Sequence, residues 1–173
     1  MSLYGDLDLS IIDELPPGRK DVITVHRKDK NRLKVFGFIR DQIKQGRQIY
    51  IVYPLIEESK KMDLKYLEDG LESITREFDK ENYSIGVMHG RMRSSNKDIE
   101  MNNFLNGKID ILISTTVIEV GVNVPNASVM IIENAERFGL SQLHQLRGRV
   151  GRGKYDSYCC LLYTSPSPRD KHR

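Results

Sequence analysis

The chain has 173 residues, of which 39% are apolar and 29% charged, a composition typical of one water-soluble domain with its own core. No apolar run approaches the roughly 20 residues that span a bilayer, and the N-terminus lacks the basic and apolar segments of a secretory signal. We therefore expect a cytoplasmic protein without a membrane partner. Cys159 and Cys160 are adjacent and are the only cysteines, which excludes a disulfide scaffold and a structural zinc site built on cysteine.

The net charge of +3 is unevenly distributed along the chain. Residues 147–173 contain seven arginines and lysines against two aspartates, a net charge of +5, whereas residues 1–146 carry a net charge of −2. A basic C-terminal part is compatible with an anion site. On charge alone, a solvated basic face followed by a flexible tail is the favoured interpretation.

The first half of the chain alternates β-branched runs with segments of helical period. Residues 22–25 predict a strand, and apolar residues spaced three and four apart at 33–43 predict an amphipathic helix that ends at Gly46. A second strand is predicted at 49–53. Apolar residues repeat with the same spacing at 64–78, which predicts a second helix facing the core.

The second half continues this alternation, beginning with a strand at 84–89. Ser94 and Ser95 are candidate N-caps of a helix that runs through Leu105 and stops at Gly107. The remaining predicted elements, in chain order, are a strand at 109–113, a short helical turn at 115–121, a strand at 129–132, a helix at 140–146 and a strand at 158–163.

Strands that alternate with helices of these lengths predict an α/β fold with a parallel sheet. The strands are apolar on both faces, which agrees with helices covering both sides of the sheet. We expect an open sheet of about six strands formed by residues 21–163, preceded by a separate segment at 1–20. Residues 164–173 contain two prolines and no apolar period, so we expect a disordered or foreign tail.

The stretch most informative about chemistry is residues 145–153, Gln-Leu-Arg-Gly-Arg-Val-Gly-Arg-Gly. Glycine lets a backbone approach a ligand closely, and the planar fork of arginine fits phosphate oxygens and keeps its charge. A flexible basic turn that contacts nucleic acid also contains Gly-Arg pairs. The complete run Gln-x-x-Gly-Arg-x-Gly-Arg is much more specific.

That run resembles motif VI of superfamily 2 helicases, and the resemblance extends backward through the chain. Residues 113–127 resemble motif V, residues 88–92 resemble the motif before it, and residues 52–59 resemble motif IV. Among these helicases the chain is most similar to the RecG family, bacterial ATP-dependent DNA helicases that remodel branched DNA. Residues 4–19 match the segment after motif III, so the resemblance covers roughly residues 4–163.

The resemblance implies a RecA-like fold and the second of two motor lobes, with ATP bound between the lobes. In the family, the first lobe holds Mg²⁺ and the phosphates, and no G-x-x-x-x-G-K-[ST] run exists in this chain. We therefore expect the parent protein to be an ATP-dependent DNA helicase of the bacterial cytoplasm, and this chain alone to be inactive. The implied partners are branched or forked DNA, the missing first lobe and a DNA-binding wedge domain.

Matched residue by residue, the motifs also imply roles for single side chains. Arg149 and Arg152 fall on the arginines that reach the γ-phosphate, with Arg152 as the arginine finger, and Gln145 falls where motif VI couples the lobes. Gly121 and Asn123 fall beside the nucleotide; many related motors carry aspartate at the Asn123 position, and asparagine can still accept from the ribose without the charge. The residues implied for the DNA backbone are Thr115, Thr116, His89, Gly90 and Arg91. No metal ligand is implied.

Several of these residues have simpler interpretations. Thr115 and Thr116 fit a plain N-cap pair about equally well, and a lone histidine such as His89 is more often structural than functional. Their expected place at strand carboxyl ends, where open parallel sheets bind ligands, supports the functional interpretation.

Two other classes of protein fit parts of the sequence. A lobe of a transcription-repair coupling translocase shares residues 13–19 in variant form, whereas residues 4–8 favour RecG. A nucleotide-binding module without a motor would share the sheet, but it has no need for motifs IV, V and VI together in order.

Overall fold

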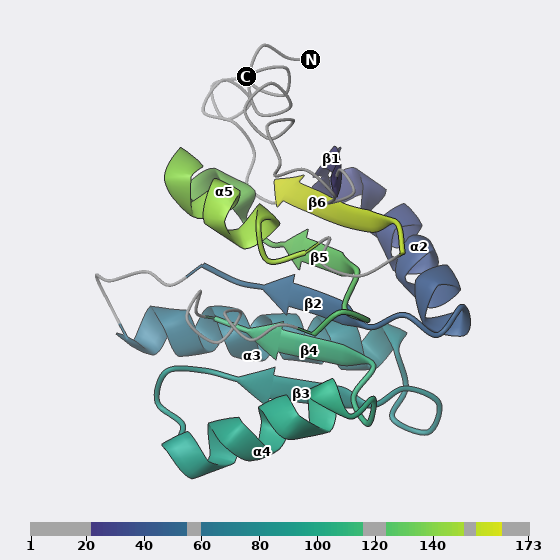
Figure 1. The fold of residues 1–173 in the computed structure, drawn as a ribbon. Coiled ribbons are helices and arrows are strands. Elements are labelled where there is room, and N and C mark those ends of the chain that lie inside the picture. The colour runs from purple at the N-terminus through teal and green to yellow at the C-terminus, as the bar shows by residue number, and fades with distance from the viewer. Residues whose placement is uncertain (1–21, 55–59, 116–123, 151–154, 164–173) are drawn as a thin grey trace.

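The computed structural model describes residues 22–54, 60–115, 124–150 and 155–163 (Figure 1). Within these residues six strands form one sheet in the order β1-β6-β5-β2-β4-β3, and every neighbouring pair is parallel. The strands are β1 (Val22–Lys28), β2 (Ile49–Val52), β3 (Ile85–Met88), β4 (Ile111–Ser114), β5 (Val129–Ile132) and β6 (Ser157–Tyr163). The predicted open parallel sheet is confirmed.

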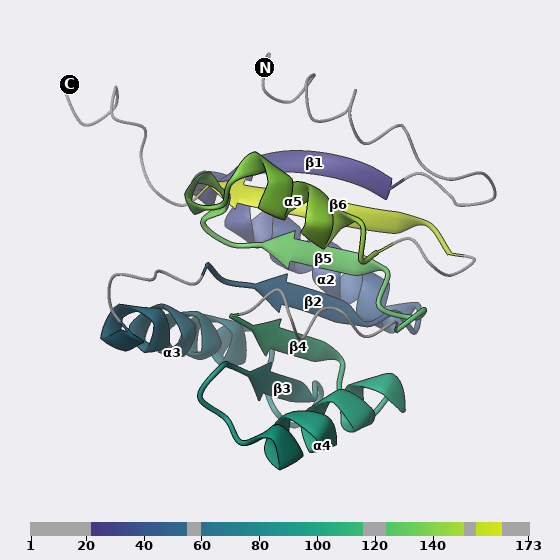
Figure 2. The same cartoon turned by 60° about the vertical axis from the view of Figure 1, so that its left-hand side comes forward.

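Helices cover both faces of this sheet. Within the described residues the α-helices are α2 (Arg32–Lys44), α3 (Lys60–Glu77), α4 (Ser94–Leu105) and α5 (Leu140–Arg147), and the short 3₁₀ helices η1 (Asp29–Asn31) and η3 (Ala135–Arg137) precede α2 and α5. Figures 1 and 2 show α2 and α3 on one face and α4 and α5 on the other. None of the helices in the described part of the chain is long and apolar enough to cross a membrane.

The sheet separates two apolar cores. On the α2–α3 side, Phe36 and Phe78 meet edge to face with ring centres 5.7 Å apart. On the α4–α5 side, Tyr50 and Phe104 meet in the same way at 4.9 Å. All four residues of β2 are buried, and alternate residues enter opposite cores. A central strand between two helical layers is therefore apolar without alternation, as its sequence indicated.

Two glycines end helices as predicted. Gly46 follows α2 with φ +89° and Gly107 follows α4 with φ +80°, a backbone conformation that side chains with a Cβ rarely adopt. The N–H of Arg47 donates to the Gln42 carbonyl over 2.9 Å, and the N–H of Lys108 donates to the Asn103 carbonyl over 2.8 Å. These bonds complete Schellman motifs, which satisfy carbonyls left free at helix ends.

The start of α4 and several strand boundaries differ from the prediction. α4 begins at Ser94 itself, with Arg93 at the N-cap and no side-chain capping bond, so the prediction of Ser94 or Ser95 as N-cap is wrong. β1 continues to Lys28 because β6 pairs with it along its whole length. β4 begins at Ile111, two residues later than predicted. The segments 1–20 and 164–173, and the predicted helical turn beyond Thr115, lie outside the described residues.

Gly70 lies in α3 against the ring of Tyr53, and this contact predicts an unusual response to alanine. A Cβ at position 70 would lie 2.2 Å from the Tyr53 Cζ and Oη atoms. Tyr53 is only 5% exposed, so its ring has little room to move. We expect Gly70→Ala to lower the free energy of unfolding by about 1–3 kcal/mol, although alanine is ordinarily favoured over glycine in a helix by about 1 kcal/mol.

Gly37 in α2 provides the matched control, because a Cβ there meets no heavy atom within 4 Å. Gly37→Ala should stabilise the protein by about 0.4–1 kcal/mol, and each kcal/mol shifts the melting temperature by about 2–4 °C for a chain of this size. Thermal unfolding of the two variants measures the sign of each effect. Equal stabilisation by both substitutions would contradict the tight packing of Gly70 on Tyr53.

Candidate functional site

The carboxyl ends of four strands meet at one edge of the sheet. Tyr53, His89, Thr115 and Glu133 directly follow β2, β3, β4 and β5, and we call these four residues the carboxyl edge. Three backbone bonds join the ends of these four strands: Tyr53 N–H donates to the Ser114 carbonyl over 2.9 Å, Thr115 N–H to that of Met88 over 3.3 Å, and Glu133 N–H to that of Val52 over 2.8 Å. Open parallel sheets bind ligands at this edge.

The His89–Arg91 segment forms a tight turn after β3. The Arg91 backbone N–H donates to Nδ1 of His89 over 3.2 Å, and the Met92 N–H donates to the His89 carbonyl over 3.2 Å. Gly90 and Arg91 are exposed, whereas His89 is half-buried. The imidazole therefore shapes the turn that presents Arg91 to solvent, and the contact of this segment with DNA stays a prediction.

Thr115 lies at the same edge but is buried, with 4% of its surface exposed. Three of the other predicted residues near it, Thr116, Gly121 and Asn123, lie outside the described residues. The structure thus brings Thr115 and His89 to one edge, as predicted, and the ligand contacts of all five residues stay predictions.

Helix α5 presents Gln145 to solvent while Leu143 and Leu146 pack into the core. The helix begins after Gly139, whose N–H donates to Oε1 of Gln142 over 2.9 Å. This bond is the side-chain half of a capping box, and it satisfies a donor at the helix start. An exposed Gln145 is accessible to a second lobe, as its predicted role requires.

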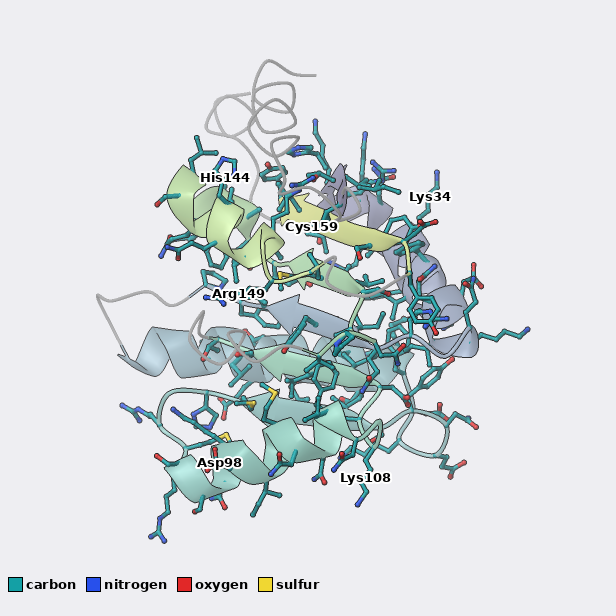
Figure 3. The ribbon with its side chains drawn as sticks, in the orientation of Figure 1. Lys34, Asp98, Lys108, His144, Arg149 and Cys159 are labelled. Atoms are coloured by element: carbon teal, nitrogen blue, oxygen red, sulfur yellow. The ribbon has the colours of Figure 1, made fainter. Side chains whose placement is uncertain are left out.

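Arg149 follows α5 and is half-buried on the α4–α5 side of the sheet (Figure 3). Among the residues that the structure describes, none forms an ion pair with its guanidinium. Its charge acts on the phenol of Tyr50 in β2: burial raises the pKa of Tyr50 to about 12, and Arg149 opposes this rise. A cation without an ion-pair partner is suited to bind an anion. Arg152 lies outside the described residues.

Arg147 serves a different purpose, because it is buried with 4% of its surface exposed. Its Nε donates to the Thr24 hydroxyl over 2.6 Å, and its Nη2 donates to the Val22 carbonyl. Both acceptors lie at the start of β1. Arg147 therefore joins the end of α5 to the edge at which the strands begin, opposite the carboxyl edge.

An ion-pair network at the carboxyl edge was not predicted from the sequence. Arg32 donates to both carboxylate oxygens of Glu133, over 2.5 and 2.8 Å, and its Nε donates to Asp29 over 2.8 Å. Burial of Arg32 works against its charge, but Glu133 and Asp29 outweigh this and hold its pKa above the ordinary value. The sequence feature that could have indicated this network was a single acidic residue, Glu133, directly after the apolar strand at 129–132.

The described residues contain no cluster of three side chains that could hold a metal ion. Both cysteines are buried thiols, and burial raises the pKa of the Cys160 thiol to about 12. These thiols therefore belong to the apolar cores and not to a reactive site.

Comparison with known proteins shows the family. The chain matches the helicase conserved C-terminal domain over residues 28–154. It is 50% identical over 173 residues to the ATP-dependent DNA helicase RecG of Synechocystis, covering all of this chain and 21% of that protein. It is 51% identical to RecG of Thermotoga maritima, covering 94% of this chain and 21% of that protein. The chain thus spans about a fifth of the length of these relatives.

Solved structures agree with the sequence comparison. RecG bound to a three-way DNA junction superposes with a TM-score of 0.72 at 45% identity, covering 92% of this chain and 20% of that chain. The C-terminal part of the Fun30 ATPase domain superposes with a TM-score of 0.58 at 18% identity, which shows a shared fold alone. The chain therefore belongs to the helicase conserved C-terminal domain family, as a RecG-like lobe with a RecA-like sheet.

Proposed function

We propose that this chain is the second motor lobe of an ATP-dependent DNA helicase that remodels branched DNA in recombination and repair. The observation that carries the proposal is the likeness to RecG, at about half identity along the whole chain. The solved RecG structure bound to a three-way junction supports branched DNA as the substrate class. A motor acting on bacterial DNA works in the cytoplasm, and it needs the first lobe and a wedge domain as partners.

The nucleotide side of the proposal assigns ATP to the α4–α5 side of this lobe. Arg149 has no ion-pair partner among the described residues, so a phosphate oxygen fits its guanidinium. Arg149 and Arg152 would contact the γ-phosphate, Gly121 and Asn123 would lie beside the sugar, and Gln145 would couple the two lobes. Bound ATP supplies the phosphoryl group, with Mg²⁺ held by the first lobe. The arginines of this chain stabilise negative charge on the transferring group.

The DNA side of the proposal uses the carboxyl edge and the turn beside it. Exposed Arg91, presented by the His89 turn and Gly90, donates to a backbone phosphate, and Thr115 and Thr116 contribute hydroxyl donors. Such contacts carry no base sequence information. Other parts of the parent protein would therefore recognise the geometry of the DNA. This lobe would bind the DNA backbone and move it.

Steady-state ATPase measurements test the proposal. With Mg²⁺, the parent protein should hydrolyse ATP and should be stimulated more by three-way junctions or forks than by linear duplex of equal length. This chain alone should show no turnover above that of its Arg152→Ala variant, because the phosphate-binding loop is in the other lobe. Turnover by the isolated chain would contradict a shared site.

The two alternative classes give different results in the same assay. A parent that is stimulated equally by linear and branched duplex would favour a translocase of the transcription-repair coupling kind. A parent that binds nucleotide and never hydrolyses it would favour a binding module without a motor.

A further inference from the structure

Arg32, Glu133 and Asp29 form a partly buried ion-pair network where two parts of the chain meet. The Glu133 side chain is 3% exposed and the Arg32 side chain 21% exposed. The guanidinium fork holds both carboxylate oxygens at 2.5 and 2.8 Å, which leaves Glu133 one preferred orientation. Arg32 is the first residue of α2, and Asp29 belongs to the 3₁₀ helix before it, so the network is anchored on the β1–α2 connection.

Glu133 is the point at which β5 leaves the sheet. Its backbone N–H still donates to Val52 of β2 over 2.8 Å, and the next residue, Asn134, turns the chain with φ +51°. Asparagine adopts this left-handed conformation more readily than most residues with a Cβ, so Asn134 suits a sharp turn directly after Glu133. The turn leads through η3 into α5 and then to Arg149.

Tyr53 adds the exit of β2 to the same junction. Burial raises the pKa of its phenol, Glu133 adds to the rise and Arg32 opposes it, and its ring packs against α3 at Gly70. The network thus lies where two segments leave the carboxyl edge. One segment follows the end of β2, and the other leads from β5 to α5.

We propose that Arg32 is a positioning residue for Arg149: by orienting Glu133, it sets the direction in which β5 exits and thereby the placement of α5 and the arginine after it. This inference rests on the proposed function for its catalytic consequence, because Arg149 must act on the phosphates. Arg32 itself contacts neither nucleotide nor DNA in this role.

Two other arginines provide matched comparisons. Arg40 of α2 pairs with Glu77 of α3 over 2.8 Å, but this pair is 39% and 30% exposed and touches no strand exit. Arg147 holds α5 at the start of β1, at the opposite edge of the sheet. Loss of Arg40 should affect stability without redirecting the segments that leave the carboxyl edge, whereas loss of Arg147 should loosen the end of α5 and leave the exit of β5 unchanged.

The activity test uses the parent protein with saturating branched DNA. Arg32→Gln should reduce kcat for ATP about tenfold or more while the KM for ATP changes less than about threefold, because a misplaced arginine weakens contacts made in the transition state. Arg32→Lys should recover only part of kcat, since an ammonium cannot hold both carboxylate oxygens in the same plane. Arg40→Gln should leave kcat within about twofold of the unchanged protein.

A double variant, Arg32→Met with Glu133→Leu, separates positioning from stability. Apolar replacement of a buried pair often restores or raises stability, so this variant should fold even where Arg32→Gln does not. If Arg32 positions α5 through the fork, kcat should stay low at a melting temperature close to that of the unchanged protein. A double variant with normal kcat would overturn the proposal.

Amide hydrogen exchange on the 173-residue chain tests the positioning without any assay of function. Arg32→Gln should accelerate exchange at 133–147 about tenfold relative to β2 and β4, whereas Arg40→Gln should leave 133–147 unchanged. Uniform acceleration in every element, or none, would overturn the positioning role. A parent without ATPase activity would contradict the proposed function and leave the exchange result valid by itself.

Discussion

Replacing Arg152 by alanine in the parent protein should reduce ATP turnover on the order of 10³-fold or more, by analogy with other arginine fingers. The residue lies in the Gly-Arg-x-Gly-Arg run, where the resemblance assigns it to the γ-phosphate. A side chain that must face another lobe contributes little to the core of its own lobe. Folding and ATP binding should therefore remain close to those of the unchanged protein. Steady-state ATPase with saturating forked DNA, together with nucleotide binding, measures both quantities.

The chemically closest substitution sharpens this test. Arg152→Lys keeps the positive charge but loses the planar fork, so it should recover little of the lost turnover. A lysine variant with nearly full activity would show that charge alone suffices at this position. Full activity of Arg152→Ala would show that the register assigned to motif VI is wrong.

Replacing Arg147 by alanine should have the opposite profile, with a large loss of stability and a small loss of activity. The guanidinium is buried and donates to Thr24 and Val22 of β1. Hydrogen bonds from a charged group contribute about 1.5–3 kcal/mol each, so for these two bonds we expect a loss of about 3–6 kcal/mol and a melting temperature lower by about 6–24 °C. Well below that temperature, turnover should fall less than tenfold.

The pair of variants is informative because the two arginines are five residues apart in one motif-like run. Their surroundings differ in the two expected roles: Arg147 donates to a hydroxyl and to a backbone carbonyl of its own lobe, whereas the resemblance assigns Arg152 to the γ-phosphate. Abolished turnover in Arg147→Ala with an unchanged melting temperature, combined with normal turnover in Arg152→Ala, would exchange the two roles.

Regular elements were predictable because short-range patterns determine them. The strand at 129–132 is found with the predicted bounds, and the glycines at 46 and 107 end their helices where predicted, since each reflects a local apolar run or a local φ requirement. Boundaries that depend on a neighbouring strand were less accurate. β1 extends over polar residues because β6 supplies a partner for their backbone groups, and this pairing leaves no mark in the sequence of β1.

Candidate site residues were predictable as types but not as environments. The motif run identified Gln145, Arg147 and Arg149 as one group, yet the fold separates them into an exposed residue, a buried residue and a half-buried residue. Their positions around the end of a packed helix decide this, because a rotation of about 100° per residue turns neighbouring side chains toward different surroundings.

The sequence by itself determined the α/β class, the order of the elements and the family, and it predicts which arginines face a phosphate. Those properties follow from local apolar periods and from a motif whose residues are contiguous in the sequence. Tertiary structure alone decided which distant groups meet: Arg32 with Glu133 across 101 residues, Arg147 with Thr24 across 123, and Gly70 with Tyr53. The physical reason is that strand order and helix packing set the distances between these residues in space. Nothing in the sequence around either partner identifies the other.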